Sequence, residues 1–308
     1  MAKFLKKFVV GVDGGGTKTV AALTNLKGKI IKIAKAGPAN LRNVGVKKAM
    51  ENVAKAIEKV LPKKGKILST FIGLAAFAEE FKEREKEILK ELKKHKKISP
   101  IFEGKVKLDS DQKIAFFAGA EKKGVILICG TGLGCRGFLG EKEVKVSGWG
   151  YLADEGSAFF IGQKVFQAVM KDLDKREKRT ILTDLIFKKW KFKKKTDILD
   201  FVYKNPPQNL AQFSKICDLA AKRGDKIAKK ILKEAAREAA LSAKTAIREI
   251  GLKNKKFPLV LSGSVFKSEI FKKEVIKQIK KFSPKAKIIL LKKEPVIGAI
   301  KLALRELP

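Results

Sequence analysis

A short strand, a glycine-rich loop and a returning strand occur twice in this sequence, at residues 9–23 and 125–139. The first stretch reads VVGVDGGGTKTVAAL and the second reads VILICGTGLGCRGFL. Glycines lack a Cβ, so the backbone can turn sharply and its amides can approach an anion. A plain hairpin turn is the simpler alternative for either loop taken alone. Two such loops facing one another would bind one polyphosphate from both sides.

The first loop differs from two better-known phosphate loops. A Walker loop ends in Gly-Lys-Ser or Gly-Lys-Thr and opens a helix, whereas here Thr17 separates Gly16 from Lys18. A dinucleotide-binding loop also leads into a helix, but residues 19–23 are β-branched and apolar and lead to a further strand. Asp13 and the Thr17 hydroxyl lie beside bare backbone amides, which suits a hydrated metal and a phosphate together.

The length and composition predict two packed domains and give no sign of a membrane or zinc site. The chain has 308 residues, of which 45% are hydrophobic, enough for two cores. No stretch approaches the roughly 20 uncharged apolar residues of a membrane span, and the basic N-terminus runs into a strand, so we expect a cytoplasmic protein. The three cysteines have no CxxC spacing and the single histidine lies among lysines, which argues against a zinc site or a disulfide framework.

The net charge of +38 raises the alternative of a nucleic-acid partner. Most of the 70 basic residues are lysines, and they are spread over nearly every predicted surface helix. Arginine is the residue favoured for bidentate phosphate and base recognition, so this surface is more typical of a compositional or thermophilic bias. We therefore do not expect nucleic acid to be the main partner.

The order of predicted elements fits an α/β protein with mixed sheets flanked by helices. The first half reads as three strands, a helix over 44–61, a strand over 67–74, a helix over 79–96, a strand over 105–108 and a helix over 112–120. The second half restarts with strands at 125–129 and 135–139, continues with helices over 156–250, the longest over 226–250, and has later strands at 257–261 and 288–291. The repeated pattern suggests a duplicated architecture.

Acidic and aromatic residues lie near both glycine loops. Asp109 and Asp111 end a strand and precede a helix, where an acid is either a helix N-cap or a general base that accepts a proton from an attacking hydroxyl. Asp111 is the better candidate because it stands nearer the helix. The stretch SGWGYLADEGS carries Trp149, Asp154 and Glu155 in a glycine frame. Core packing and helix capping are alternatives there, but this combination suits a polyhydroxylated ligand.

Six motifs together resemble a known family. They are DGGGTKT, SDQKIAFFAGA, ICGTGLGCR, GWGYLADEGSAFFIG, LSGSVF and EPVIGAIKLAL, spread from about residue 8 to 306. In order and spacing the set resembles the N-acetylglucosamine kinase branch of the BadF/BadG/BcrA/BcrD ATPase-type family, within the sugar kinase, Hsp70 and actin superfamily. The helical stretch from about 170 to 250 carries none of these motifs.

The resemblance implies two actin-like (RNase H-like) lobes with the active site in the cleft between them. The first lobe would span residues 1–118 and be joined by a C-terminal helix over 296–308. The second would span 119–295 and contain a helical insertion at about 156–250. The family also suggests a homodimer.

The resemblance further implies an ATP-dependent sugar kinase that uses Mg²⁺. Asp13 is similar to the acid that contacts magnesium through water, and Asp111 to the catalytic base that activates a sugar hydroxyl. The implied ATP-binding residues are Asp13, Gly15, Gly16, Thr17, Lys18, Thr131, Gly132, Gly263 and Ser264. The implied sugar-binding residues are Asn40, Asp111, Gly148, Trp149, Gly150 and Asp154.

One departure from the family affects the identity of the sugar. Leu133 and Gly134 stand where eukaryotic N-acetylglucosamine kinases have Ser-Asn, so a side-chain amide that contacts the sugar is missing. We expect phosphorylation of an amino sugar, foremost N-acetyl-D-glucosamine at its 6-hydroxyl, with glucosamine, N-acetylmuramic acid and glucose as alternatives.

Two other classes of function remain open. One is the family's ATPases that activate acyl-CoA dehydratases and reductases, often with a cysteine-bound iron–sulfur cluster. It fits less well, because the three cysteines lack such a context. The other is a nucleotide-dependent scaffold without phosphoryl transfer, which has no need of a general base.

Overall fold

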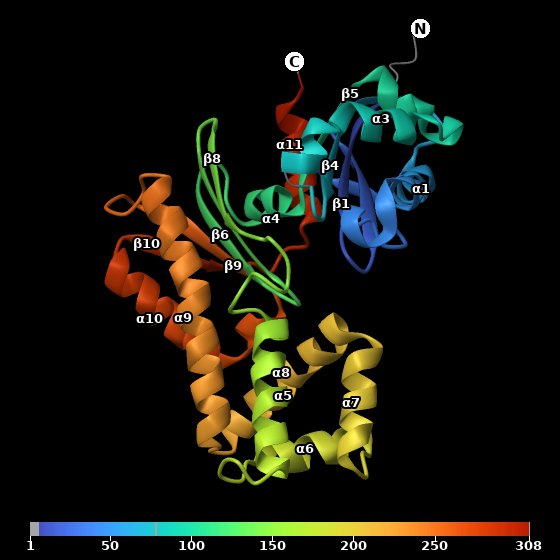
Figure 1. Ribbon diagram of the computed structural model, residues 1–308. Coiled ribbons are helices and arrows are strands. Elements are labelled where there is room, and N and C mark those ends of the chain that lie inside the picture. Colours follow the sequence, from blue (N-terminus) through green and yellow to red (C-terminus); the bar gives the residue numbers. More distant parts are fainter. Residues whose placement is uncertain (1–5, 78, 308) are drawn as a thin grey trace, which may run out of the picture. The chain divides into compact units, whose positions relative to one another are not determined.

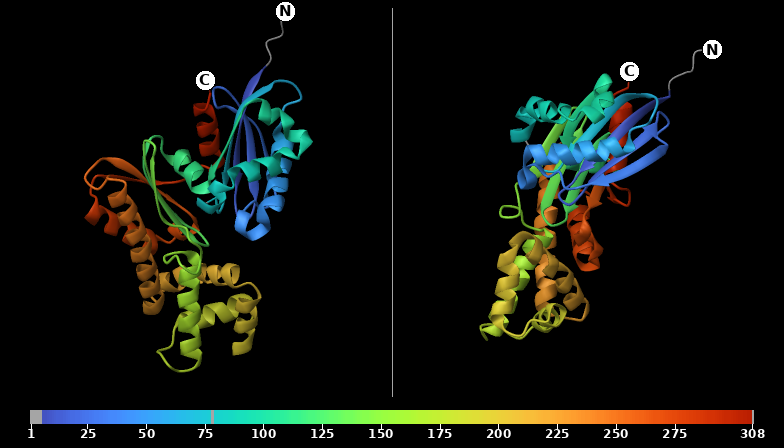
Figure 2. Two further views of the ribbon diagram at one scale, coloured as in Figure 1. Left: turned by 45° about the horizontal axis from the view of Figure 1, so that its top comes forward. Right: turned by 90° about the vertical axis from the view of Figure 1, so that its right-hand side faces the viewer.

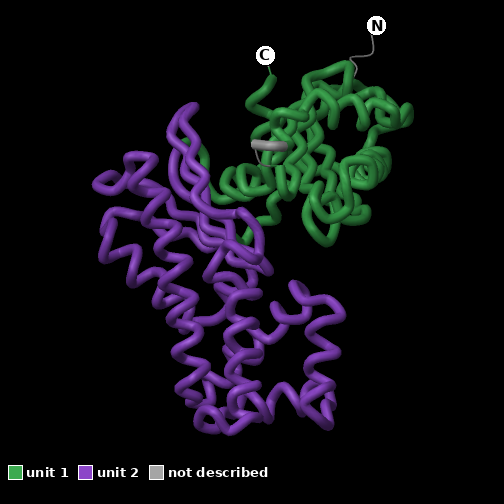
Figure 3. The backbone as a smooth tube through the Cα atoms, in the orientation of Figure 1, with its two compact units in different colours: residues 1–122, 291–308 green, residues 123–290 purple. Residues whose placement is uncertain are grey.

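The computed structural model of the protein describes residues 6–77 and 79–307, which fall into two compact units. Unit 1 comprises residues 1–122 and 291–308, and unit 2 comprises residues 123–290 (Figure 3). The sequence predicted lobe boundaries after residues 118 and 295, whereas the units divide after 122 and after 290. The first boundary moves because Lys123 is already the first residue of a strand in the second sheet. Residues 1–5, 78 and 308 of the predicted lobes lie outside the described residues.

Unit 1 contains, among its described residues, a five-stranded mixed sheet in the order β3-β2-β1-β4-β5. The pairs β1/β2 and β2/β3 are antiparallel, whereas β1/β4 and β4/β5 are parallel. Its strands are β1 (Lys7–Gly14), β2 (Thr19–Asn25), β3 (Ile30–Ala36), β4 (Lys66–Leu74) and β5 (Lys105–Ser110). Its helices are α1 (Leu41–Val60), α2 (Glu79–Glu83), α3 (Glu85–Lys93), the 3₁₀ helix η1 (Lys96–Glu103), α4 (Asp111–Gly119) and α11 (Val296–Arg305).

Helices cover both faces of the first sheet, and the alternation along β2 shows why. Ala21 and Leu23 pack into the core that contains α1, whereas Val20 and Ala22 pack against Val296 and Ile300 of α11. Successive side chains of a strand point to opposite faces, so an all-apolar strand is buried on both. Figures 1 and 2 show α1 and α11 on opposite sides of this sheet. Because β1 lies buried in this sheet, the position of its end is fixed by the packing, and Asp13 and the first glycine loop lie at that end.

Unit 2 repeats this topology with a second five-stranded sheet, in the order β10-β9-β6-β7-β8 for its described residues. Here β6/β7 and β7/β8 are antiparallel, and β6/β9 and β9/β10 are parallel, as in unit 1. Its strands are β6 (Lys123–Cys129), β7 (Leu133–Leu139), β8 (Lys142–Ser147), β9 (Phe257–Ser262) and β10 (Ala286–Leu290). The α/β class with two helix-flanked mixed sheets and the duplicated architecture predicted from the sequence are both confirmed.

The helices of unit 2 include a region without a counterpart in unit 1. They are α5 (Ala158–Leu173), α6 (Ile181–Trp190), α7 (Lys195–Lys204), α8 (Pro206–Lys222), α9 (Lys226–Glu249), η2 (Ser264–Lys267) and α10 (Glu269–Phe282). Alanines line the buried face of α9, among them Ala235, Ala239 and Ala243, so that neighbouring elements approach its backbone closely.

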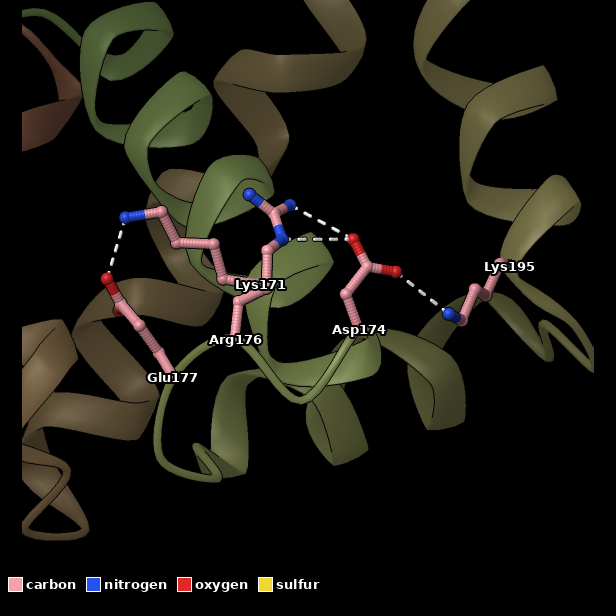
Figure 4. Close-up of polar contacts among 5 residues, drawn as sticks. All are labelled: Lys171, Asp174, Arg176, Glu177 and Lys195. Atoms are coloured by element: carbon pink, nitrogen blue, oxygen red, sulfur yellow. Dashed lines mark hydrogen bonds and ion pairs between the residues drawn. The ribbon is translucent and has the colours of Figure 1, made fainter.

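Ion pairs at the end of α5 connect it with the helices that follow. Asp174 accepts hydrogen bonds from Arg176 at 3.0 and 3.2 Å and from Lys195, the first residue of α7, at 2.9 Å (Figure 4). Lys171 donates to Glu177 at 2.6 Å in the same turn. Such exposed pairs each contribute little to stability, roughly 0–1 kcal/mol. The packing of the helical region comes instead from its aromatic core, which includes Trp190 and Phe213.

Several predicted elements differ from the structure. The helix predicted over 79–96 is two helices that break at Arg84, and the 3₁₀ helix η1 with Pro100 inside it follows them. The helix predicted over 44–61 is preceded by one extra turn that starts at Leu41, because Asn40 accepts hydrogen bonds from the amides of Arg42 and Asn43 as an N-cap. Gly45, with a φ of +73°, kinks α1 after this turn. The sequence analysis missed β8 and α10 altogether. Within the described residues, no helix is long and apolar enough to span a bilayer.

Candidate active site

The first glycine loop follows directly from the buried strand β1. Its tip, from Gly16 to Lys18, is exposed, whereas Thr19 is fully buried as β2 begins. The amide of Gly15 donates to the carbonyl of Lys18 at 3.0 Å, which closes the turn. The carbonyl of Gly14 accepts the amide of Ala75, after β4, at 2.8 Å. The loop is therefore anchored at its base by a neighbouring strand and open at its tip.

Asp13 lies at the start of this loop in an unfavourable environment for a negative charge. Burial, and after it the carboxylates of Asp111 and Glu294, raise the pKa of Asp13 to about 7, and Lys18 lowers it. Lys18 also forms an ion pair with Glu294 at 3.9 Å. A partly buried carboxylate beside two others gains stability from a nearby cation, as expected of a group that faces a hydrated metal ion.

Asp111, and not Asp109, is the acid that lies near Asp13. The carboxylate of Asp109 forms an ion pair with Lys113 at 2.7 Å and accepts the amide of Ser110 at 2.7 Å. The N-cap of α4 is Ser110, whose hydroxyl accepts the amide of Lys113, and Asp111 is the first helical residue. The capping role that the sequence left open for Asp111 is thus filled by its neighbour.

Asn40 has a structural role at the start of α1. Its Oδ1 accepts the amides of Arg42 at 3.0 Å and Asn43 at 3.2 Å. An N-cap of this kind contributes about 1 kcal/mol to helix stability. Its Nδ2 has no hydrogen bond to any described residue, so a donor is available for a ligand.

The second glycine loop lies in unit 2, and the first residues of helix α5 are hydrogen-bonded to it. The amide of Gly130 donates to Gly132 at 3.0 Å, and the carbonyls of Gly130 and Thr131 accept the amides of Ala158 and Phe159 at 2.8 and 3.1 Å. Ala158 is the first residue of α5. These bonds attach the loop after Trp149 to the second glycine loop, so both motifs form one local structure.

Gly263 packs against the strand that leads into the second loop. Its φ is +107°, and a Cβ there would lie 2.2 Å from the carbonyl oxygen of Cys129. Only glycine satisfies both conditions. The structure thereby places LSGSVF beside the second glycine loop, with Ser264 exposed at the start of η2.

Asp154 organises the loop that contains Trp149. Its carboxylate accepts the amide of Gly148 at 3.1 Å and the amide of Gly150 at 2.8 Å, and its side chain is buried. Trp149 lies between these glycines with 53% of its surface exposed. The Nζ of Lys145 lies 3.6 Å from the centroid of the Trp149 ring. Trp149 is therefore presented to solvent on a fixed backbone, and Asp154 faces its own loop.

Three glycines have no role that the fold itself requires. Gly16, Gly130 and Gly132 lack a left-handed φ, and a Cβ added to any of them would have no atom within 4 Å. Alanine would therefore fit the described fold at each position, although glycine loses more conformational freedom on folding. Open space beside bare backbone on both loops is the geometry expected where phosphate oxygens approach amides.

The family assignment agrees with this geometry. The chain matches the BadF/BadG/BcrA/BcrD ATPase family over residues 10–303, nearly its whole length. This chain belongs to the BadF/BadG/BcrA/BcrD ATPase family. Membership of this ATPase family implies that the protein uses ATP, as we predicted from the sequence.

Two curated relatives of this BadF/BadG/BcrA/BcrD family member cover almost the entire chain. An N-acetylmuramic acid/N-acetylglucosamine kinase from Clostridium acetobutylicum is 31% identical over 97% of this chain and 99% of the relative. An N-acetyl-D-glucosamine kinase from Dictyostelium discoideum is 29% identical over 97% of this chain and 98% of the relative. A solved structure from Chromobacterium violaceum, provisionally named an N-acetylglucosamine kinase, has a TM-score of 0.76 at 21% identity and covers 97% of this chain and 99% of its own.

The structure brings together two groups of predicted site residues. Unit 1 holds Asp13, the first loop, Asn40 and Asp111, and unit 2 holds the second loop, Gly263, Trp149 and Asp154. The sequence analysis missed Glu294 near Asp13; its position just before the C-terminal helix in EPVIGAIKLAL was the available signal. Among the described residues, no cluster of three or more His, Cys, Asp or Glu side chains could bind a metal ion directly. The roles of the individual site residues stay predictions.

Proposed function

We propose that this protein is an ATP-dependent kinase that transfers the γ-phosphate of ATP to a hydroxyl of an amino sugar, foremost the 6-hydroxyl of N-acetyl-D-glucosamine. The observation that carries the proposal is the pair of anchored glycine loops with open space at Gly16, Gly130 and Gly132, together with Asp111 beside Asp13. Its family and its two relatives named as kinases of N-acetylated amino sugars support it.

In the proposed reaction the protein mainly positions the reactants and neutralises charge. The sugar hydroxyl oxygen attacks the γ-phosphorus, the bond from that phosphorus to the β–γ bridging oxygen breaks, and ADP leaves. The hydroxyl proton passes to the carboxylate of Asp111, which acts as general base. Backbone amides of Gly16 and Gly132 donate to phosphate oxygens, and Lys18 offsets their negative charge.

The residues around Asp13 fit a magnesium ion bound mainly through water. Asp13 is a carboxylate whose ionised form is disfavoured by burial and by two neighbouring acids, which is the environment a cation relieves. The described residues offer no complete set of protein ligands, so most ligands would be water and phosphate oxygens. When bound, Mg²⁺ would neutralise charge on the β- and γ-phosphates.

The sugar would contact residues of both predicted groups. Asn40 has its Nδ2 available as a donor, and Trp149 offers an exposed aromatic ring on which a sugar can pack. We propose that Asp154 acts first by fixing Gly148 and Gly150, because its carboxylate already accepts both amides. Glucosamine, N-acetylmuramic acid and glucose remain alternative substrates.

The alternative of an ATPase that activates an acyl-CoA dehydratase or reductase is less well supported. It requires cysteine thiolates that bind an iron–sulfur cluster. Cys129, Cys135 and Cys217 are fully buried, and burial raises the pKa of each thiol well above its usual value. A purified protein that contains iron would favour this alternative.

Homodimer formation stays a prediction that light scattering can test.

The proposed function is tested by ADP release measured with a panel of sugars. We expect N-acetyl-D-glucosamine to stimulate ADP release at least tenfold over the rate without sugar, and Asp111→Asn to abolish that stimulation. If no sugar stimulates ATP turnover by the wild-type protein, or if Asp111→Asn keeps full activity, the proposal is wrong.

A further inference from the structure

The loop of residues 37–40, which leads to Asn40, is hydrogen-bonded on both sides. Two side chains donate to its carbonyls: the Thr19 hydroxyl to Gly37 at 2.7 Å and the Asn52 Nδ2 to Pro38 at 2.7 Å. One backbone amide of the loop, that of Ala39, donates to the carbonyl of Gly15 at 2.9 Å. The loop is therefore tied to the first glycine loop and oriented by two side chains.

Asn52 is an unusual residue for its place in the structure. It lies on the buried face of α1 with 5% of its surface exposed, among Ala49, Val53 and Ala56. A buried amide is costly unless it is hydrogen-bonded, so an apolar residue would suit this face of α1 better on packing grounds alone. A Cβ added at Gly37 would lie 2.8 Å from the Nδ2 of Asn52. The side chain and the loop therefore fit each other closely.

Thr19 also donates a hydrogen bond to the loop of residues 37–40, in this case from a strand of the first sheet. It is the first residue of β2, its side chain is fully buried, and it pairs with Ala36, the last residue of β3. Its hydroxyl therefore reaches the carbonyl of Gly37, the next residue. Thr24, on the same strand, is equally buried, yet its hydroxyl has no hydrogen-bond partner among the described residues. A buried threonine on β2 is thus not in itself a sign of a loop contact.

We propose that Thr19 and Asn52 are positioning residues that hold Asn40, the predicted sugar contact, at a fixed place beside the first phosphate loop. Neither side chain is placed to contact substrate. Thr19 donates to the carbonyl of residue 37, and Asn52 donates to the carbonyl of residue 38. The next residue, Ala39, donates to Gly15 and directly precedes Asn40. This inference rests on the proposed kinase function.

The positioning role predicts a selective effect on the sugar. Gly15 keeps its own turn bond to the carbonyl of Lys18 at 3.0 Å, and the carbonyl of Gly14 keeps its bond to Ala75. The phosphate loop therefore remains anchored when a contact to Gly37 or Pro38 is lost. Asn40 keeps its N-cap bonds and the bond of Ala39 to Gly15, but the loop before it loses one of the two side-chain bonds that set its orientation. A purely structural role would instead lower stability and reduce the active fraction, leaving both KM values unchanged.

The test compares near-isosteric variants in the full-length protein by steady-state ADP release. Thr19→Val removes the hydroxyl that bonds Gly37, Thr19→Ser keeps it, and Thr24→Val is the matched control on the same strand. We expect Thr19→Val to raise the KM for N-acetyl-D-glucosamine by about fivefold to tenfold, as for one lost hydrogen bond. The KM for ATP should change by less than about twofold, and Thr19→Ser and Thr24→Val should resemble the wild type.

Asn52→Leu provides a second variant of similar size, which removes the donor to Pro38 without placing an ionisable group on the buried face of α1. We expect the same selective rise in the KM for the sugar. If neither Thr19→Val nor Asn52→Leu raises the sugar KM above that of Thr24→Val, or if the KM for sugar and the KM for ATP rise equally, the positioning role is wrong while the kinase function stands. A wild-type protein without sugar-stimulated turnover would overturn the kinase function and this inference with it.

Discussion

Asp111 lies close enough to Asp13 for the negative charge of one carboxylate to raise the pKa of the other. Asp13 is near the end of β1 and Asp111 is the first residue of α4, which follows β5. Parallel β1, β4 and β5 end at the same edge of the first sheet, so the fold brings these two acids together. Two acids at one edge favour a division of roles, one near the phosphates and one at the reacting hydroxyl.

The raised pKa of Asp13 predicts a pH dependence of stability. The pKa rises from 3.8 to about 7 in the folded protein, so between these values the folded state binds more protons than the unfolded state. The stability that the neutral Asp13 contributes is fully present below pH 3.8 and is lost as the pH rises to about 7.

Asp13→Asn removes this dependence. We expect the variant to melt a few degrees above the wild type at pH 8, and this difference to shrink toward pH 5. Thermal unfolding without nucleotide at both pH values measures it. A variant that is less stable than the wild type at pH 8 would contradict the unfavourable charge at Asp13. Addition of ATP and Mg²⁺ should stabilise the wild type but not Asp13→Asn.

The two acids around Ser110 offer a matched pair for the general base. Asp111→Asn should lower the rate of sugar-stimulated ADP release by about 10²–10⁴-fold, the usual contribution of a general base. Asp109→Asn should lower it by less than about threefold, because that carboxylate forms an ion pair with Lys113. Steady-state rates of both variants decide the assignment. Equal losses in the two would mean that the acids act together or through the fold.

The sequence was sufficient for the architecture because its signals are local. The runs before and after each glycine loop are mostly apolar and buried, as expected of strands covered on both faces, with Arg136 of β7 as a charged exception. Both loops lie where they were predicted. The helix expected over 79–96 is interrupted because the backbone at Arg84 leaves the helical conformation, and arginine, a good helix former, gives no sign of this break in the sequence. The strand β8 was missed although Lys142 to Ser147 alternates lysine and valine at its centre, because its many charges favour a loop interpretation.

The site was harder to predict because its side chains bond across the chain. Nothing in the order of residues shows that both carboxylate contacts of Asp154 go to Gly148 and Gly150. Likewise, Asn52 reads as a polar interruption of an apolar helix face until its bond to Pro38 is known. Motifs locate the ends of strands, whereas the division between ligand contact and loop support depends on the folded geometry.

The open glycines predict variants that separate binding from folding. A Cβ at Gly16 meets no atom within 4 Å and requires no unusual backbone angle, so Gly16→Ala should melt within about 2 °C of the wild type. The same methyl group should obstruct a phosphate that approaches the amide, and we expect the KM for ATP to rise at least about tenfold. Gly132→Ala in the second loop should behave alike.

Gly263→Ala provides the contrast. Its Cβ would lie 2.2 Å from a carbonyl oxygen at a φ of +107°, so we expect lost stability before any specific effect on ATP. Melting temperatures and ATP titrations of the three variants test the distinction. Unchanged ATP binding in both Gly16→Ala and Gly132→Ala would exclude these loops as the phosphate site.

The two tryptophans allow sugar binding to be observed without turnover. Trp149 is 53% exposed in the proposed sugar loop, whereas Trp190 packs against the rings of Phe201 and Phe213 in the helical region. A sugar that covers Trp149 removes water from its ring, so we expect a saturable blue shift of fluorescence on addition of N-acetyl-D-glucosamine. Trp190→Phe should keep this response and Trp149→Phe should lose it. A response that persists in Trp149→Phe would place the sugar elsewhere and remove Trp149 from the proposed site.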